Sequence, residues 1–130
     1  MDTSGIIKAS QLEARLKELQ ENLEFVDSQI IELEQFSGSI KAFGESVSKE
    51  KEIMASIGKG VHVPAEIKGS DLLVEVGAGI VLKKSPEQTL EVVNSQLARI
   101  KEARINLLSE TDSTRSEFFS LVQELESVNK

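Results

Sequence analysis

The sequence predicts an α+β fold that is mainly helical: a long antiparallel coiled-coil hairpin of two α-helices, joined by two short β-hairpins. Three observations support this prediction. Two segments space their apolar residues alternately by four and by three, a glycine-containing segment separates them, and Ser85-Pro86-Glu87 marks a helix start. We expect helices at about 8–50 and 86–129 and the hairpins at 53–84, within one unit that spans 1–130.

Composition excludes several classes of protein. The 130-residue chain is 39% hydrophobic but only 4% aromatic, so Leu, Ile and Val must form most of the buried surface. Its net charge of -7 opposes binding to nucleic acid or to an anionic membrane surface. The chain contains no cysteine, no apolar run long enough to span a membrane and no export signal, and these features favour a cytoplasmic location.

The first helix is expected from a stripe of apolar residues that runs from Leu12 to Val47. Charged and amide side chains fill most of the other positions. Such spacing keeps one narrow face toward a partner helix over about five heptads. Ser10 with Glu13 forms a candidate capping box, and Ser4 is an alternative, earlier start.

The second helix is expected from a similar stripe between Val93 and Val128. Its start is well marked, because Ser85-Pro86-Glu87-Gln88 supplies an N-cap hydroxyl, a proline at the first helical position, an acidic first turn and a glutamine that can complete a capping box. Both stripes therefore predict a coiled coil in which the two helices run antiparallel.

Polar residues and one glycine interrupt the two stripes. Ser37 and Gly44 interrupt the first, and Arg104, Thr111 and Thr114 interrupt the second. Two interpretations are open: flexible points, or polar seam positions that fix the register of the two helices at some cost in stability. We favour the second, because register specification is the better attested role of polar seam residues.

Between the helices, the pattern apolar, Gly, x, Gly, apolar, x, apolar occurs twice, at 57–63 and at 76–82. Glycine readily adopts the positive φ that a tight turn between strands requires, so each copy predicts a β-hairpin. Pro64 cannot donate to a strand ladder and is expected at a sheet edge or a bulge. The expected strands are about 53–58, 60–67, 72–77 and 79–84.

Two isolated hairpins leave unpaired edges and apolar faces. The coiled-coil stripes are already used against each other, so the hairpins are expected to pair with those of other subunits in a closed or continuous β structure. This predicts an obligate oligomer. The hairpin residues expected at its interfaces are Val61, Val63, Ile67, Leu72, Val74, Val76, Gly77, Gly79, Ile80 and Leu82.

The hairpin region resembles one known family. The sequence Gly60-Val61-His62-Val63-Pro64-Ala65-Glu66-Ile67, followed by Leu73-Val74-Glu75-Val76-Gly77-Ala78-Gly79-Ile80-Val81-Leu82-Lys83-Lys84 and the Ser85 helix start, is similar to alpha-class prefoldin subunits. Two hairpins distinguish this class from the single-hairpin beta class. The resemblance covers nearly the whole chain.

The resemblance implies a hexamer of two alpha and four beta subunits, so the expected partners are prefoldin beta subunits and a second alpha copy. It also implies β-barrels built from the hairpins, and ATP-independent capture of unfolded client proteins at the ends of the coiled coils. The resemblance further implies transfer of these clients to a group II chaperonin. Each of them is an expectation drawn from the family.

The free ends of the two helices are the expected client-binding tips. Terminal turns of a coiled coil fray and expose their seam residues, which gives a dispersed apolar surface without sequence specificity. The alternative is that these residues only complete the coiled coil. The expected tip residues are Ile6, Ile7, Leu12, Leu121, Val122, Leu125 and Val128.

Signals of catalysis are weak, and we expect no enzyme activity, no cofactor and no metal. His62 is the only histidine, and Gly58-Lys59-Gly60 does not continue into a phosphate-binding motif. The main alternative to a chaperone is a coiled-coil adaptor subunit that tethers specific partners and has no general affinity for unfolded chains.

Overall fold

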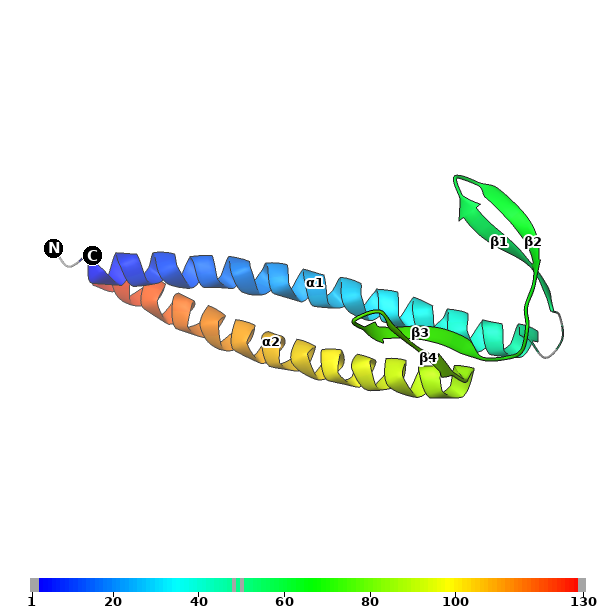
Figure 1. Ribbon diagram of the computed structural model, residues 1–130. Helices are drawn as coiled ribbons and strands as arrows, with labels where there is room; N and C mark the ends of the chain where they lie inside the picture. The colour runs from blue at the N-terminus through cyan, green and yellow to red at the C-terminus, as the bar shows by residue number, and fades with distance from the viewer. Residues whose placement is uncertain (1–2, 48, 50, 129–130) are drawn as a thin grey trace. The chain divides into compact units, whose positions relative to one another are not determined.

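The computed structural model describes residues 3–47, 49 and 51–128 (Figure 1). It confirms the predicted fold class of two long helices and two small antiparallel hairpins. Formation of a β-barrel stays a prediction. The elements are α1 (Ser4–Val47), β1 (Glu52–Gly58), β2 (Val61–Glu66), β3 (Leu72–Gly77), β4 (Ile80–Lys84) and α2 (Pro86–Val128).

The chain divides into two compact units. We call residues 1–31 with 98–130 the terminal unit, because it holds both chain ends, and residues 32–97 the central unit. The terminal unit contains the start of α1 and the end of α2. The central unit contains both hairpins and the helical turns next to them.

The helix starts agree with the sequence in one case and correct it in the other. The Ser85 hydroxyl accepts a hydrogen bond from the Gln88 amide, and the Gln88 side chain accepts one from the Ser85 amide, both at 3.1 Å. This reciprocal capping box confirms the predicted start of α2. In contrast, α1 begins at Ser4, the earlier alternative, and Ser10 with Glu13 lies inside the helix.

In the terminal unit, the two helices run antiparallel along a narrow seam. Leu19 is fully buried and Leu23 is 7% exposed, and Thr111 and Thr114 are buried as well. The Thr111 hydroxyl donates to the Leu107 carbonyl at 2.7 Å, so its polar group is satisfied within its own helix. The seam therefore accepts threonine without leaving a buried hydroxyl unpaired.

In the central unit, the seam is formed by the turns of α1 and α2 nearest the hairpins. Ile40, Val93 and Leu97 are buried, as is Ser37. A Cβ on Gly44 would lie 3.5 Å from the Cβ of Pro86, which is ordinary van der Waals contact. Ser37, Thr111 and Thr114 are thus buried in seam positions, whereas their predicted role in fixing the register stays a prediction.

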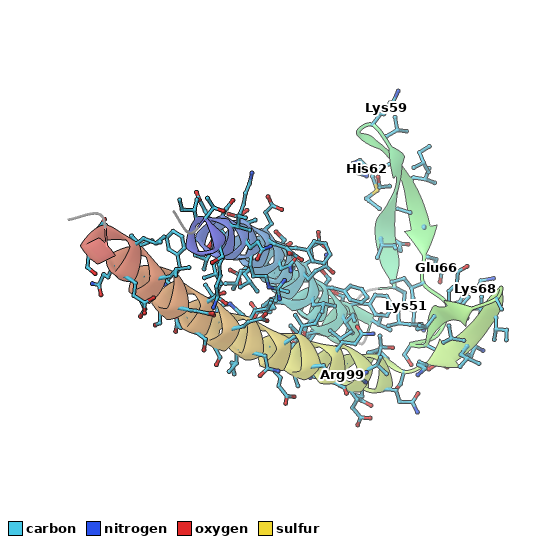
Figure 2. All side chains as sticks on the ribbon, turned by 90° about the vertical axis from the view of Figure 1, so that its left-hand side faces the viewer. Lys51, Lys59, His62, Glu66, Lys68 and Arg99 are labelled. Carbon is cyan, nitrogen blue, oxygen red and sulfur yellow. The ribbon has the colours of Figure 1, made fainter. Side chains whose placement is uncertain are left out.

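Each hairpin has the same turn, and the internal repeat in the sequence explains why. The central residues of both turns have positive φ, 50° at Lys59 and 79° at Gly60 in the first, and 52° at Ala78 and 75° at Gly79 in the second. These values suit a type I′ turn, whose twist matches that of the flanking strands. Lys59 lies at the turn of the first hairpin (Figure 2).

Strand pairing is regular up to a bulge beside each turn. In the first hairpin Ala55 pairs with Val63 and the register shifts between Ser56 and Gly58. In the second hairpin Val74 pairs with Leu82, with a shift between Glu75 and Gly77. Pro64 pairs with Met54 in a sheet of two strands. Both strands are edge strands, which confirms the expected edge position of a proline that has no amide hydrogen to donate.

Candidate functional site

The register of the first hairpin places an apolar face opposite a mixed face, which also carries the pair of Met54 with Pro64. Ile53, Val61 and Val63 belong to the apolar face and are 40%, 52% and 43% exposed. On the opposite face, Ser56 pairs with His62. Side chains alternate across a strand, so one face of the hairpin is available for burial by another chain.

In the second hairpin, the predicted interface residues also share one face. Leu72, Val74 and Leu82 lie on it, with Val76 and Ile80 beside the turn. The burial along this face is uneven, because Leu72 and Val74 are half-buried whereas Val76 and Ile80 are about half exposed. Thus the strand end near the helices is partly covered and the turn end is open.

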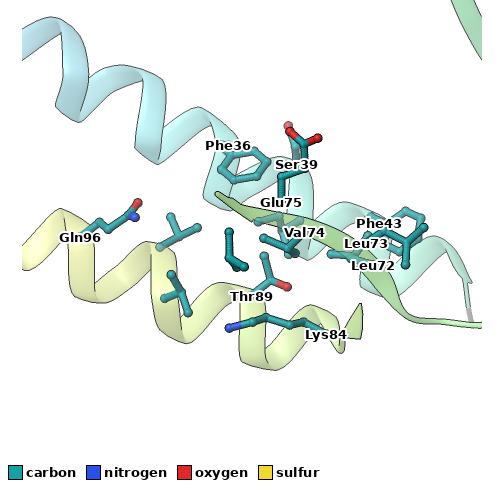
Figure 3. Close-up of a pocket in the computed structure, with 14 residues that line it drawn as sticks. Phe36, Ser39, Phe43, Leu72, Leu73, Val74, Glu75, Lys84, Thr89 and Gln96 are labelled. Carbon is teal, nitrogen blue, oxygen red and sulfur yellow. The ribbon is translucent and has the colours of Figure 1, made fainter. Parts of the chain in front are cut away.

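The helical turns of the central unit cover that strand end and leave an apolar groove of about 750 Å³ between themselves and β3 (Figure 3). Phe36 and Phe43 from α1 and Val93 from α2 contribute to its lining. Sequence reasoning missed this groove, because a hairpin that packs on a coiled coil has no periodic signature.

The remaining predicted interface residues lie near the turns or at a strand end. Gly77 ends β3, and Gly79 lies in the turn that follows it. Ile67 follows β2, where its amide donates to the Lys51 carbonyl at 2.6 Å and thereby closes the base of the first hairpin. The predicted interface residues thus lie in or next to two separate two-stranded sheets.

At the chain ends, the structure distinguishes exposed tip residues from seam residues. Ile6 and Ile7 are each 55% exposed. The other described members of the predicted tip are half-buried, and the side chain of Val128 lies outside the described residues. The half-buried members are Leu12, Leu121, Val122 and Leu125.

Two details of the tip were missed in the sequence. Phe119 is 59% exposed although it was not assigned to the tip, and its ring makes an edge contact with Phe118 at 6.3 Å between centroids. Gly5 lies against Leu125, so that a Cβ there would approach the Leu125 Cδ2 to 2.9 Å. The start of α1 and the end of α2 are therefore closely packed.

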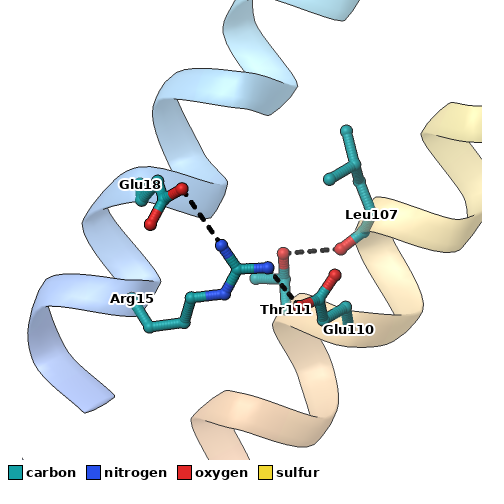
Figure 4. A network of polar contacts seen from close by, with 5 residues as sticks. All are labelled: Arg15, Glu18, Leu107, Glu110 and Thr111. Carbon is teal, nitrogen blue, oxygen red and sulfur yellow. Dashed lines mark hydrogen bonds and ion pairs between the residues drawn. The ribbon is translucent and has the colours of Figure 1, made fainter. Parts of the chain in front are cut away.

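Ion pairs link the two helices of the terminal unit. Arg15 contacts Glu110 on α2 and also Glu18 on its own helix at 3.2 Å (Figure 4). Its hydrogen bonds to Glu110 and then to Glu18 raise the pKa of Arg15 above its ordinary value. Lys8 pairs with Glu117 at 3.5 Å. These pairs show which turns of α1 and α2 face each other.

Metal binding has no support among the residues that the structure describes. No three His, Asp or Glu side chains within residues 3–47, 49 and 51–128 gather closely enough to hold a metal ion. In the same part of the chain, neither helix is apolar enough over a sufficient length to cross a membrane. The hairpin faces and the tip carry exposed apolar side chains and are the candidate interaction surfaces.

Known proteins with similar sequences belong to one family. The prefoldin subunit family model matches residues 12–130. Prefoldin subunit alpha of Archaeoglobus fulgidus is 27% identical over 119 residues, which cover 86% of this chain and 87% of that protein. Prefoldin subunit alpha of Methanosphaera stadtmanae is 30% identical over 87 residues, which cover 63% of each.

A solved structure shares the fold. The cryo-EM structure of filamentous PFD from Methanocaldococcus jannaschii has a TM-score of 0.72 and 17% identity, and the match covers 88% of this chain and 95% of that one. Prefoldins are chaperone subunits that assemble with other prefoldin subunits. Since the family model covers nearly the whole sequence and two hairpins separate the helices, this chain belongs to the prefoldin family, as an alpha-class subunit.

Proposed function

We propose that this chain is a subunit of an ATP-independent holdase, which captures unfolded proteins at the tips of α1 and α2 and delivers them to a group II chaperonin. The main support is the exposure of Ile6 and Ile7 at the start of α1. Exposed apolar side chains at a helix end bind apolar segments weakly and without a required sequence. We expect this chaperone activity in the cytoplasm.

The hairpins serve assembly in this proposal. Exposed apolar residues such as Val61 and Val63 need a partner surface, and β-barrels formed with other subunits would cover them. The expected assembly contains two alpha and four beta prefoldin subunits. Several tips around one space raise the effective concentration of weak contacts, so a client is held while each contact stays reversible and no nucleotide is needed.

The proposal is tested by removing residues 1–11 and 118–130 and assembling the shortened chain with a beta subunit. Native mass spectrometry should find the same assembly, because the hairpins are intact. Suppression of aggregation should be lost for several unrelated denatured proteins. Unchanged suppression would reject the tip as the client site, and suppression limited to one protein before truncation would favour an adaptor.

A further inference from the structure

A second heptad stripe runs along α2 on a face beside the seam. Its apolar members form two pairs, Ile105 with Leu108 and Phe119 with Val122, fourteen residues apart. Ile105 is 65% exposed and Phe119 is 59% exposed. A spacing of two heptads keeps both pairs on one helix face, so α2 presents apolar side chains to solvent as well as to α1. We call this face the lateral stripe.

Charged residues complete the lateral stripe in steps of three and four. Asp112 and Arg115 lie between the apolar pairs, Lys101 precedes them and Glu126 follows them, and all four are exposed. Asp112 and Arg115 are 3.6 Å apart within the helix, with side chains 77% and 53% exposed. A pair so exposed is weak and leaves its charges available to another surface.

When the order of its residues is reversed, the lateral stripe is complementary to itself, because charged positions meet opposite charges and apolar positions meet apolar ones. Two copies of α2 can lie antiparallel about a two-fold axis between positions 112 and 115. Every apolar residue then meets an apolar residue, and every charge meets its opposite, as an isologous contact requires. Across the axis, Asp112 faces Arg115, Leu108 faces Phe119, Ile105 faces Val122, and Lys101 faces Glu126.

Residues of α1 extend the same face at both ends. A groove of about 490 Å³ holds Ile31 of α1 beside Ile105 of α2, and Ile31 is 55% exposed. At the other end, Gly5 of α1 lies against Leu125 of α2, and the exposed Ile6 follows Gly5 as Phe119 follows the seam residue Phe118. The two-fold arrangement would bring Ile31 of one copy toward Ile6 of the other.

We propose that the lateral stripe docks onto a second copy of this chain, with the two α2 helices antiparallel. The contact is small, so its formation depends on concentration. This interaction goes beyond the proposed chaperone activity, but one consequence rests on that activity. Pairing covers Ile6 and Val122, so a paired copy presents less of its tip to unfolded clients.

The register is tested with introduced cysteines, because the chain has none of its own. Full-length chains carrying Lys101→Cys are mixed with chains of different mass carrying Glu126→Cys, under mild oxidation. The antiparallel register gives mainly the mixed disulfide between positions 101 and 126. A disulfide between two copies of position 126 in at least equal yield would indicate a parallel or random encounter and would overturn the proposal.

The charge complementarity is tested by Glu126→Lys, which breaks both symmetric contacts with Lys101. Self-association through this face, followed as cross-linking between Asp112→Cys and Arg115→Cys chains, should fall by about tenfold. Lys101→Glu added to Glu126→Lys should restore it. Positions 101 and 126 are too far apart on one helix to touch, so such a rescue can come only from a second copy.

Glu124→Lys is the matched control, because it makes the same charge change two residues away on another face of α2. It should leave cross-linking unchanged. An equal loss with Glu124→Lys, or no rescue by the double change, would reject the specific contact. Cross-linking is measured without clients, so the absence of the expected cross-link does not affect the holdase proposal. In the same way, a negative aggregation assay does not affect the docking result.

Discussion

Arg104 on α2 donates a hydrogen bond from Nε to Asp27 Oδ1 on α1 at 2.6 Å, although Arg104 occupies a position of the apolar stripe. The two side chains are 41% and 46% exposed. Arginine at a seam position thus turns outward and binds an acidic residue on the neighbouring helix. The pair shows that these turns of α1 and α2 lie side by side, whereas a role of Arg104 in fixing the register stays a prediction.

Replacing this arginine by an apolar residue should stabilise the helix pair. An ion pair this exposed contributes little, whereas leucine at the same position buries apolar surface. We expect Arg104→Leu to raise the free energy of unfolding by about 1 kcal/mol. Urea unfolding followed by circular dichroism measures the change. A loss of more than about 2 kcal/mol would show that the pair stabilises the fold strongly.

Gly38 lies inside α1, and a Cβ at this position would meet no atom within 4 Å. Glycine in a helix interior costs conformational entropy, so Gly38→Ala should stabilise the protein by about 0.5–1 kcal/mol. Gly44→Ala should give a similar gain, because its Cβ would make ordinary contact with Pro86.

The two glycine changes are compared by thermal unfolding and by aggregation suppression. If Gly44 is only a seam position, both variants should be more stable and equally active. A loss of activity with Gly44→Ala alone would support the other interpretation of the stripe interruptions, in which Gly44 is a flexible point.

Ala78 holds a left-handed backbone conformation, with φ at 52°. This conformation is strained for alanine but readily adopted by glycine, so Ala78→Gly should stabilise the second hairpin by about 1 kcal/mol. Hydrogen exchange of the β3 and β4 amides measures the effect locally. Faster exchange in the variant would contradict the assigned turn.

Arg15 should stabilise the pairing of α1 and α2 to the same extent throughout the neutral range. Its pKa is raised by Glu110 and Glu18, so its contribution is complete below the ordinary arginine pKa and is lost only at still higher pH. Arg15→Gln should therefore lower stability equally at about pH 6 and about pH 9. The loss should shrink as salt is added, because the pair is exposed to solvent. A loss that depends on pH in this range would point to a different group.

The sequence predicted the fold well because its strongest signals are local. The Ser85 capping box and the repeated Gly-x-Gly turns each depend on residues close together in the chain, and both are observed. The start of α1 was less certain, since Ser4 and Ser10 offer similar capping chemistry.

Cross-helix features could not be predicted in the same way. A heptad stripe fits a partner helix at several registers, so the pairing of Asp27 with Arg104 requires the structure. The exposure of Phe119 was missed because apolar spacing alone does not distinguish a seam residue from an exposed one near the helix end. Ile6 and Ile7, in contrast, were already outside the stripe, and both are exposed.

The most direct test of the central claim is the double change Ile6→Ser and Ile7→Ser at the tip. The matched control is Phe25→Ser, which removes an exposed apolar side chain of α1 away from its end, where Phe25 is 65% exposed. Each chain is assembled with a beta subunit and tested for suppression of aggregation of several unrelated denatured proteins. We expect suppression to fall severalfold for the tip variant alone, because the lost contacts act together. Equal suppression by the tip variant and the control would contradict client capture at the tip.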